Sequence, residues 1–142
     1  MSSSVKLFRG LLLASIVTGL LGSMIDQAFT GLIPPTVLKA VKDLPDPPDS
    51  TVVLSSLLVL ITFGGTMASI VGLFQFKPWS RGLAVSMTLL QLLFYPLGGM
   101  WLQSGWAAML IDFSSTLWGA VLAISYVSSL SKLFASAPVV DR

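Results

Sequence analysis

Four long apolar runs divide the chain, and the polar residues gather between them. The runs cover about residues 7–25, 52–74, 83–102 and 106–130. Each run holds roughly the 20 residues that a helix needs to cross about 30 Å of hydrocarbon. Because backbone groups in lipid must be hydrogen-bonded within their own segment, each run is predicted to be a helix. The pattern predicts an all-α fold, a four-helix transmembrane bundle, with residues 1–142 forming one domain.

The longest polar segment, residues 34–50, separates the first two runs. Its apolar positions Val37, Leu38, Val41 and Leu44 follow helical spacing, and the pair Pro34-Pro35 suits the start of a helix. We expect a short amphipathic helix that lies on the outer membrane face. The alternative is an irregular loop in which this spacing is incidental.

The basic residues are divided unequally between the two sides of the predicted bundle. Even spacing of the runs places both termini on one side, which collects Lys6, Arg9, Lys77, Arg81, Lys132 and Arg142. The other side has only Lys39 and Lys42. Since cytoplasmic loops carry the excess of Lys and Arg, this bias predicts cytoplasmic termini and an extracytoplasmic segment 34–50.

Small residues form a stripe on three of the four predicted helices, and such stripes let helices approach closely in lipid. The stripes are Ser15, Gly19, Gly22 and Asp26 in the first run, Gly65, Ala68, Ser69 and Gly72 in the second, and Ala108, Asp112, Ser115, Thr116, Gly119, Ala123 and Tyr126 in the fourth. These faces are predicted to form the bundle interior. The third run lacks a stripe and is predicted to lie at the periphery, facing lipid or another protein.

Composition strengthens the membrane interpretation. Charged residues make up 10% of the chain and hydrophobic residues 54%, and the mean hydropathy is +0.89. A fold this small in water has too few polar groups to cover that much apolar surface. The composition excludes a soluble globular protein, a disordered chain and a nucleic-acid binder. It predicts that the lipid bilayer is a partner of this protein.

The candidate chemistry is sparse. The chain has no Cys and no His, which removes thiol chemistry, zinc–thiolate sites and imidazole bases. It also lacks phosphate-binding loops, zinc-helix motifs and nucleophile elbows. We therefore predict no catalytic residue, no cofactor and no metal site, and expect a protein that is not an enzyme.

Two carboxylates near the predicted spans are the only candidates for a polar intramembrane site. Asp26 ends the first run, and Asp112 lies about two turns into the fourth, so both belong to the outer leaflet. One hypothesis is a proton- or cation-responsive site formed by both, with Gln27, Gln103 and Thr116. In the alternative, Asp112 accepts hydrogen bonds from its neighbours and Asp26 ends its helix in water.

Aromatic and basic residues flank the predicted spans as interfacial anchors. Trp79 lies between Lys77 and Arg81 in the short cytoplasmic loop, and Trp101 and Trp106 flank the outer turn before the fourth run. Amphipathic rings and cations at headgroup depth are typical of anchoring. The alternative for the cytoplasmic loop is a recognition surface for a cytosolic partner.

The layout resembles the small four-helix inner-membrane proteins of bacteria to which no activity is assigned. The resemblance is carried by Lys-Leu-Phe-Arg at 6–9, Phe-Lys-Pro-Trp-Ser-Arg at 76–81 and Asp-Phe-Ser-Ser at 112–115. It implies a bacterial inner-membrane location and brings no function with it.

The sequence thus favours a non-catalytic accessory, assembly or regulatory subunit that binds a membrane partner, or a copy of itself, through helix–helix contacts. The third run is the expected contact, because it has no interior face. One alternative is a small oligomeric transporter or channel that uses Asp112. Another is a membrane immunity-type protein that binds through its outer loop.

Overall fold

A computed structural model describes residues 3–29, 31–44, 48–94 and 102–135. Its elements are α1 (Ser3–Ala28), α2 (Pro35–Lys42), α3 (Asp49–Phe74), α4 (Pro78–Phe94), α5 (Gly105–Val127) and a 3-10 helix, η2 (Ser129–Phe134). No strand occurs in these ranges, so the all-α class is confirmed. The predicted outer-loop helix is present as α2.

In the described part of the chain, three helices, α1, α3 and α5, are long and apolar enough to cross a membrane. The part of α4 that is described has 17 residues and ends at Phe94, while residues 95–101 of the predicted third span lie outside the described part of the chain. Large apolar side chains cover the outside: Leu60, Phe63 and Leu93 are 68%, 61% and 71% exposed. Such a surface suits hydrocarbon as the surrounding solvent.

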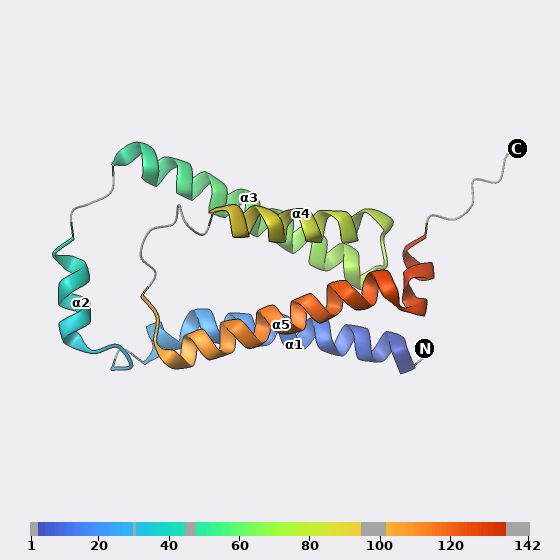
Figure 1. Cartoon of the computed structure of the whole chain (residues 1–142), viewed down its shortest axis with the longest axis horizontal. Helices are drawn as coiled ribbons and strands as arrows, with labels where there is room; N and C mark the ends of the chain where they lie inside the picture. The colour runs from blue at the N-terminus through green and yellow to red at the C-terminus, as the bar shows by residue number, and fades with distance from the viewer. Residues whose placement is uncertain (1–2, 30, 45–47, 95–101, 136–142) are drawn as a thin grey trace, which may run out of the picture.

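The long helices form two antiparallel pairs (Figure 1). α1 lies along α5, and α3 lies along α4. The pairs meet at the end of the molecule that holds the start of α1, the turn between α3 and α4, and η2, which we call the η2 end. At the opposite end, the α2 end, the pairs diverge, and α2 lies across the gap between them.

Small residues bring α1 and α5 into close contact. The Ser15 hydroxyl donates to the carbonyl of Ser114 at 3.0 Å, and the Ser114 hydroxyl donates to the carbonyl of Ser15 at 2.7 Å. One and two turns further along α1, Gly19 and Gly22 face the same helix. A Cβ at Gly22 would lie 2.9 Å from Ile111 Cγ1 and 3.2 Å from the Ala107 carbonyl oxygen. Glycine therefore sets the spacing of this pair.

Replacing Gly22 with Ala is expected to lower the free energy of unfolding by about 1–2 kcal/mol, because the added methyl group meets backbone that cannot turn aside. Gly10→Ala in the same helix is the matched control, since nothing lies within 4 Å of its Cβ position. That control should be neutral or slightly stabilising. Unfolding by SDS, followed by tryptophan fluorescence, measures both variants. Equal losses would contradict the close α1–α5 contact.

The second helix pair is also closely spaced at its η2 end. A Cβ at Gly72 would lie 2.6 Å from Ser80 Cβ and 2.9 Å from Trp79 Cη2. Two turns before Gly72 and farther from the η2 end, Gly65 of α3 faces the Met87 side chain of α4. Ala68, from the same predicted stripe, is exposed. The α3 stripe thus contacts α4 through its glycines.

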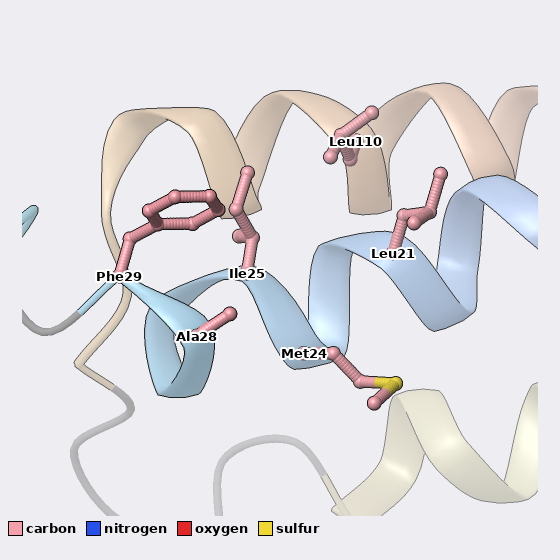
Figure 2. A pocket seen from close by; sticks show the side chains of 6 residues that line it. All are labelled: Leu21, Met24, Ile25, Ala28, Phe29 and Leu110. Atoms are coloured by element: carbon pink, nitrogen blue, oxygen red, sulfur yellow. The ribbon is translucent and has the colours of Figure 1, made fainter.

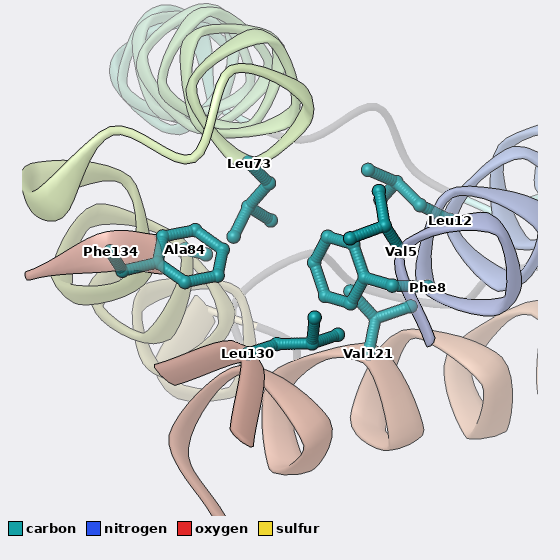
Figure 3. Packing of buried hydrophobic residues seen from close by; sticks show 8 residues of the cluster. All are labelled: Val5, Phe8, Leu12, Leu73, Ala84, Val121, Leu130 and Phe134. Carbon is teal, nitrogen blue, oxygen red and sulfur yellow. The ribbon is translucent and has the colours of Figure 1, made fainter. Parts of the chain in front are cut away.

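The hydrophobic core lies where the two pairs meet (Figure 3). Its buried members come from every helix except α2, and they are Val5, Phe8, Leu12, Leu73, Ala84, Val121, Leu130 and Phe134. Phe76, in the turn after α3, packs its ring 5.6 Å from that of Phe8 and 5.1 Å from that of Phe134. Phe76 has a φ of 55°, a strained angle for a bulky residue that these ring contacts maintain.

Candidate functional site

Asp26 joins the ends of two helices. It lies in the last turn of α1, and its Oδ2 accepts a hydrogen bond from the backbone N–H of Ser104 at 2.8 Å. Ser104 is the N-cap of α5, where its hydroxyl accepts from the N–H of Ala107. A helix N-terminus has free N–H groups and partial positive charge, both of which favour a nearby carboxylate. Asp26 therefore fastens α1 to the start of α5.

Asp112 lies on the other face of α5. Ala107, Val121 and Ser125 are the buried residues of this helix, and Asp112 is exposed on the side away from them. In the described part of the chain no hydrogen bond or ion pair reaches the Asp112 carboxylate. The nearest hydroxyl, that of Thr116, donates instead to the Asp112 backbone carbonyl at 2.9 Å.

The structure corrects the predicted orientation of α5. Asp112, Ser115, Thr116, Gly119 and Ala123 are all exposed; we call these five residues the α5 polar stripe. Tyr126, predicted on the same inward face, is also exposed, whereas Ala108 from that predicted stripe is half-buried. The physical reason is that α1 pairs with the opposite face of α5, through the reciprocal hydrogen bonds between Ser15 and Ser114. Gly119 accordingly has no atom within 4 Å of its Cβ position.

The five residues of the predicted polar site fall into two groups. Asp26 and its neighbour Gln27 end α1, and Gln103 precedes the α5 cap, so these three belong to the joint between the helices. Asp112 and Thr116 lie on the outward face of α5. Gln27 and Gln103 are exposed, and their side chains make no hydrogen bond within the described ranges. A single site containing both carboxylates is not formed within this chain.

Arg81 performs a role that the sequence did not reveal. α4 begins at Pro78, so Arg81 lies in a helix rather than a loop. Its Nη1 donates to the carbonyl of Ser125 at 3.1 Å, and its guanidinium lies 5.0 Å from the ring centroids of Tyr126 and Phe134. It therefore ties α4 to the end of α5 and to η2. Arg81 is far from Ser125, Tyr126 and Phe134 in the sequence, and only the tertiary fold brings them together.

The other predicted anchors are at the surface or undescribed. Lys77 and Trp79 are exposed at the η2 end, and Trp106 is exposed in the first turn of α5. Trp101 lies outside the described residues. Arg9 has a role similar to that of Arg81: its Nη2 donates to the carbonyl of Phe74 at 3.1 Å.

Comparisons of the chain with protein-family models, with curated proteins and with solved structures find no match.

An apolar groove lies near the α2 end (Figure 2). It has a volume of about 360 Å³ and is lined by Leu21, Met24, Ile25, Ala28, Phe29 and Leu110. No polar atom lines it, so nothing in it fixes the orientation of a substrate. Hydrocarbon, such as an acyl chain, suits this lining.

The α5 polar stripe contains an exposed carboxylate, that of Asp112, which has no partner among the described residues. A carboxylate can accept hydrogen bonds from a donor or pair with a cation. Within the described ranges no three acidic side chains gather as metal ligands would.

Proposed function

We propose that the chain is a non-catalytic integral membrane protein that acts as an accessory, assembly or regulatory subunit through helix–helix contacts. The observation that supports this is the exposed α5 polar stripe, which has an unpaired carboxylate and two residues, Gly119 and Ala123, with little or no side chain. Small residues and polar groups are what joins helices in lipid, where hydrophobicity gives no preference for protein over lipid.

The depth of Asp112 makes an open stripe unfavourable. Trp106 is exposed almost two turns earlier, at the headgroup level where tryptophan collects. Asp112 follows six residues later, about 9 Å further along the helix axis. An acidic residue at the centre of a span costs about 2.5–3.5 kcal/mol on insertion scales, and less toward the boundary. A second helix over the stripe removes part of that cost.

The contact surface in this proposal is α5 rather than the third predicted span. α4 packs on α3. It also contacts α5 through two hydrogen bonds: Trp118 Nε1 of α5 donates to the Thr88 hydroxyl at 2.9 Å, and Arg81 Nη1 donates to the Ser125 carbonyl at 3.1 Å. The outward residues of α4 include Leu89, Leu92 and Leu93, which are 55%, 62% and 71% exposed. Lipid covers leucine as well as a protein helix does, so these residues demand no partner.

The proposed membrane arrangement places four spans in a bacterial inner membrane. The third is the predicted run 83–102, of which the structure describes the part in α4. Both termini and the η2 end then lie at the cytoplasmic side, where the exposed Lys77 and Trp79 anchor the interface. α2 lies on the outer face. The unequal distribution of Lys and Arg supports this orientation.

Photo-crosslinking in cells tests the proposal. A photoreactive residue at position 119 is expected to yield a protein adduct of defined mass, which is either a dimer of this chain or a complex with another membrane protein. Position 60 in the middle of α3 is the matched control, because Leu60 is 68% exposed and should meet lipid only. Lipid adducts at both positions, together with a lone monomer in mild detergent, would overturn the proposal.

A small oligomeric transporter or channel is the second candidate, and the outward position of Asp112 favours it. Copies assembled around the α5 polar stripe would bring several carboxylates to one axis. Ion or proton flux into proteoliposomes that is lost in Asp112→Asn would support this candidate. Flux equal to that of protein-free vesicles would eliminate it.

A further inference from the structure

We infer that the α5 polar stripe binds a transmembrane helix of a different membrane protein, and that this helix carries a Lys or Arg at the depth of Asp112. The inference rests on the proposed function and specifies its partner. It follows from three observations: an unpaired carboxylate, the absence of a matching base in the described spans of this chain, and the small exposed residues that follow the carboxylate along one face of α5.

The carboxylate of Asp112 has no donor in its own helix. The neighbouring hydroxyls are already used, because Ser115 donates to the Ile111 carbonyl at 2.9 Å and Thr116 donates to that of Asp112 at 2.9 Å. Ionisable groups within a membrane pair with one another or with other polar groups. The stripe therefore needs a donor from outside the chain.

A second copy of this chain does not supply a cation at that depth. The basic residues of α1, α3, α4 and α5 are Lys6 and Arg9 near the start of α1 and Arg81 near the start of α4, all at the η2 end. Arg9 and Arg81 are held at the η2 end by carbonyls and aromatic rings. Two copies in the same membrane orientation would place Asp112 against Asp112, which repels when both are charged. Charge complementarity thus selects a different polypeptide with a basic residue in its span.

The rest of the stripe fits a helix rather than a small ligand. Gly119 and Ala123 lie seven and eleven residues beyond Asp112, on the same face of α5. They extend the small surface for about 16 Å along the helix axis. Backbones can approach closely over such residues, and this is where a partner helix would cross. The long stem of a Lys or Arg can then reach Asp112 from a neighbouring turn.

Synthetic helices in phosphatidylcholine vesicles test the inference with the full chain. The probe is a labelled 20-residue leucine–alanine peptide with one Lys at the depth of Asp112; matched peptides carry Gln or Leu there. Energy transfer to the labelled protein measures association. The Lys peptide is expected to bind at least tenfold more tightly than the Leu peptide, and Asp112→Asn should abolish that difference.

A transposed variant tests whether the stripe matters beyond its charge. Asp112→Phe combined with Phe113→Asp keeps the composition and depth but turns the carboxylate by about 100° around the helix, away from Gly119. The preference for the Lys peptide should fall to the level of Asp112→Asn. Full preference in the transposed variant would overturn the inference, since any exposed carboxylate would then suffice.

Two other outcomes would also overturn it. Equal binding of the Lys and Leu peptides excludes a basic partner. Self-association of the chain that Asp112→Asn abolishes, without any preference for the Lys peptide, assigns the stripe to a second copy. Neither outcome removes the proposed function, because crosslinking at position 119 does not depend on the charge of the partner.

Discussion

Phe8→Ala is expected to lower the free energy of unfolding by about 3 kcal/mol, the low end of the range for deleting a buried aromatic side chain. Phe8 is fully buried and packs against the ring of Phe134 (Figure 3). It also packs against the ring of Phe76. The low end applies because a side chain that leaves the core of a membrane protein meets lipid rather than water. The variant therefore loses mainly van der Waals packing and little hydrophobic free energy. The cavity would open where the two helix pairs meet.

Leu7→Ala is the matched control for Phe8→Ala. Leu7 is the preceding residue of the same helix and is 61% exposed, so its loss should change the free energy of unfolding by less than about 0.5 kcal/mol. SDS unfolding monitored by circular dichroism measures both. Similar losses would show that the core at the η2 end does not hold the helix pairs together.

Arg81→Ala is expected to cost about 3 kcal/mol. The variant loses a charge-assisted hydrogen bond to the Ser125 carbonyl and the contacts with the rings of Tyr126 and Phe134. A hydrogen bond to a charged group contributes about 1.5–3 kcal/mol and a cation–π contact about 0.5–2 kcal/mol. Arg81→Lys keeps the charge but not the planar fork, so an intermediate loss is expected.

Hydrogen exchange locates the effect of Arg81→Ala. Backbone amides of η2 should exchange faster in the variant, because Arg81 is the link between α4 and that segment, while amides in the middle of α1 should be unchanged. Lys77→Ala, which removes an exposed cation from the preceding turn, is the control and should alter neither. Unchanged exchange in η2 would contradict the role assigned to Arg81.

The helices themselves follow from local sequence. Apolar runs of sufficient length predict α1, α3 and α5 because hydropathy and backbone hydrogen bonding are properties of each segment alone. The same holds for α2, whose Pro-Pro start and spacing of Val37 and Val41 are visible without any neighbour. The end of α5 was less predictable: Ser128 caps η2 and the chain turns back, so that Leu130 and Phe134 enter the core.

The sequence alone determined which segments are helical, and the tertiary structure decided which face of each helix meets another. α5 has small residues on two sides, Ala107, Ser114 and Ser125 on one and the α5 polar stripe on the other. Periodicity identifies a stripe but not its neighbour. Two contacts with α1 determine which face of α5 is buried. Gly22 leaves room for the backbone at Ala107, and Ser15 exchanges hydrogen bonds with Ser114. That pairing is a contact between residues almost a hundred positions apart, and it turns Asp112 outward.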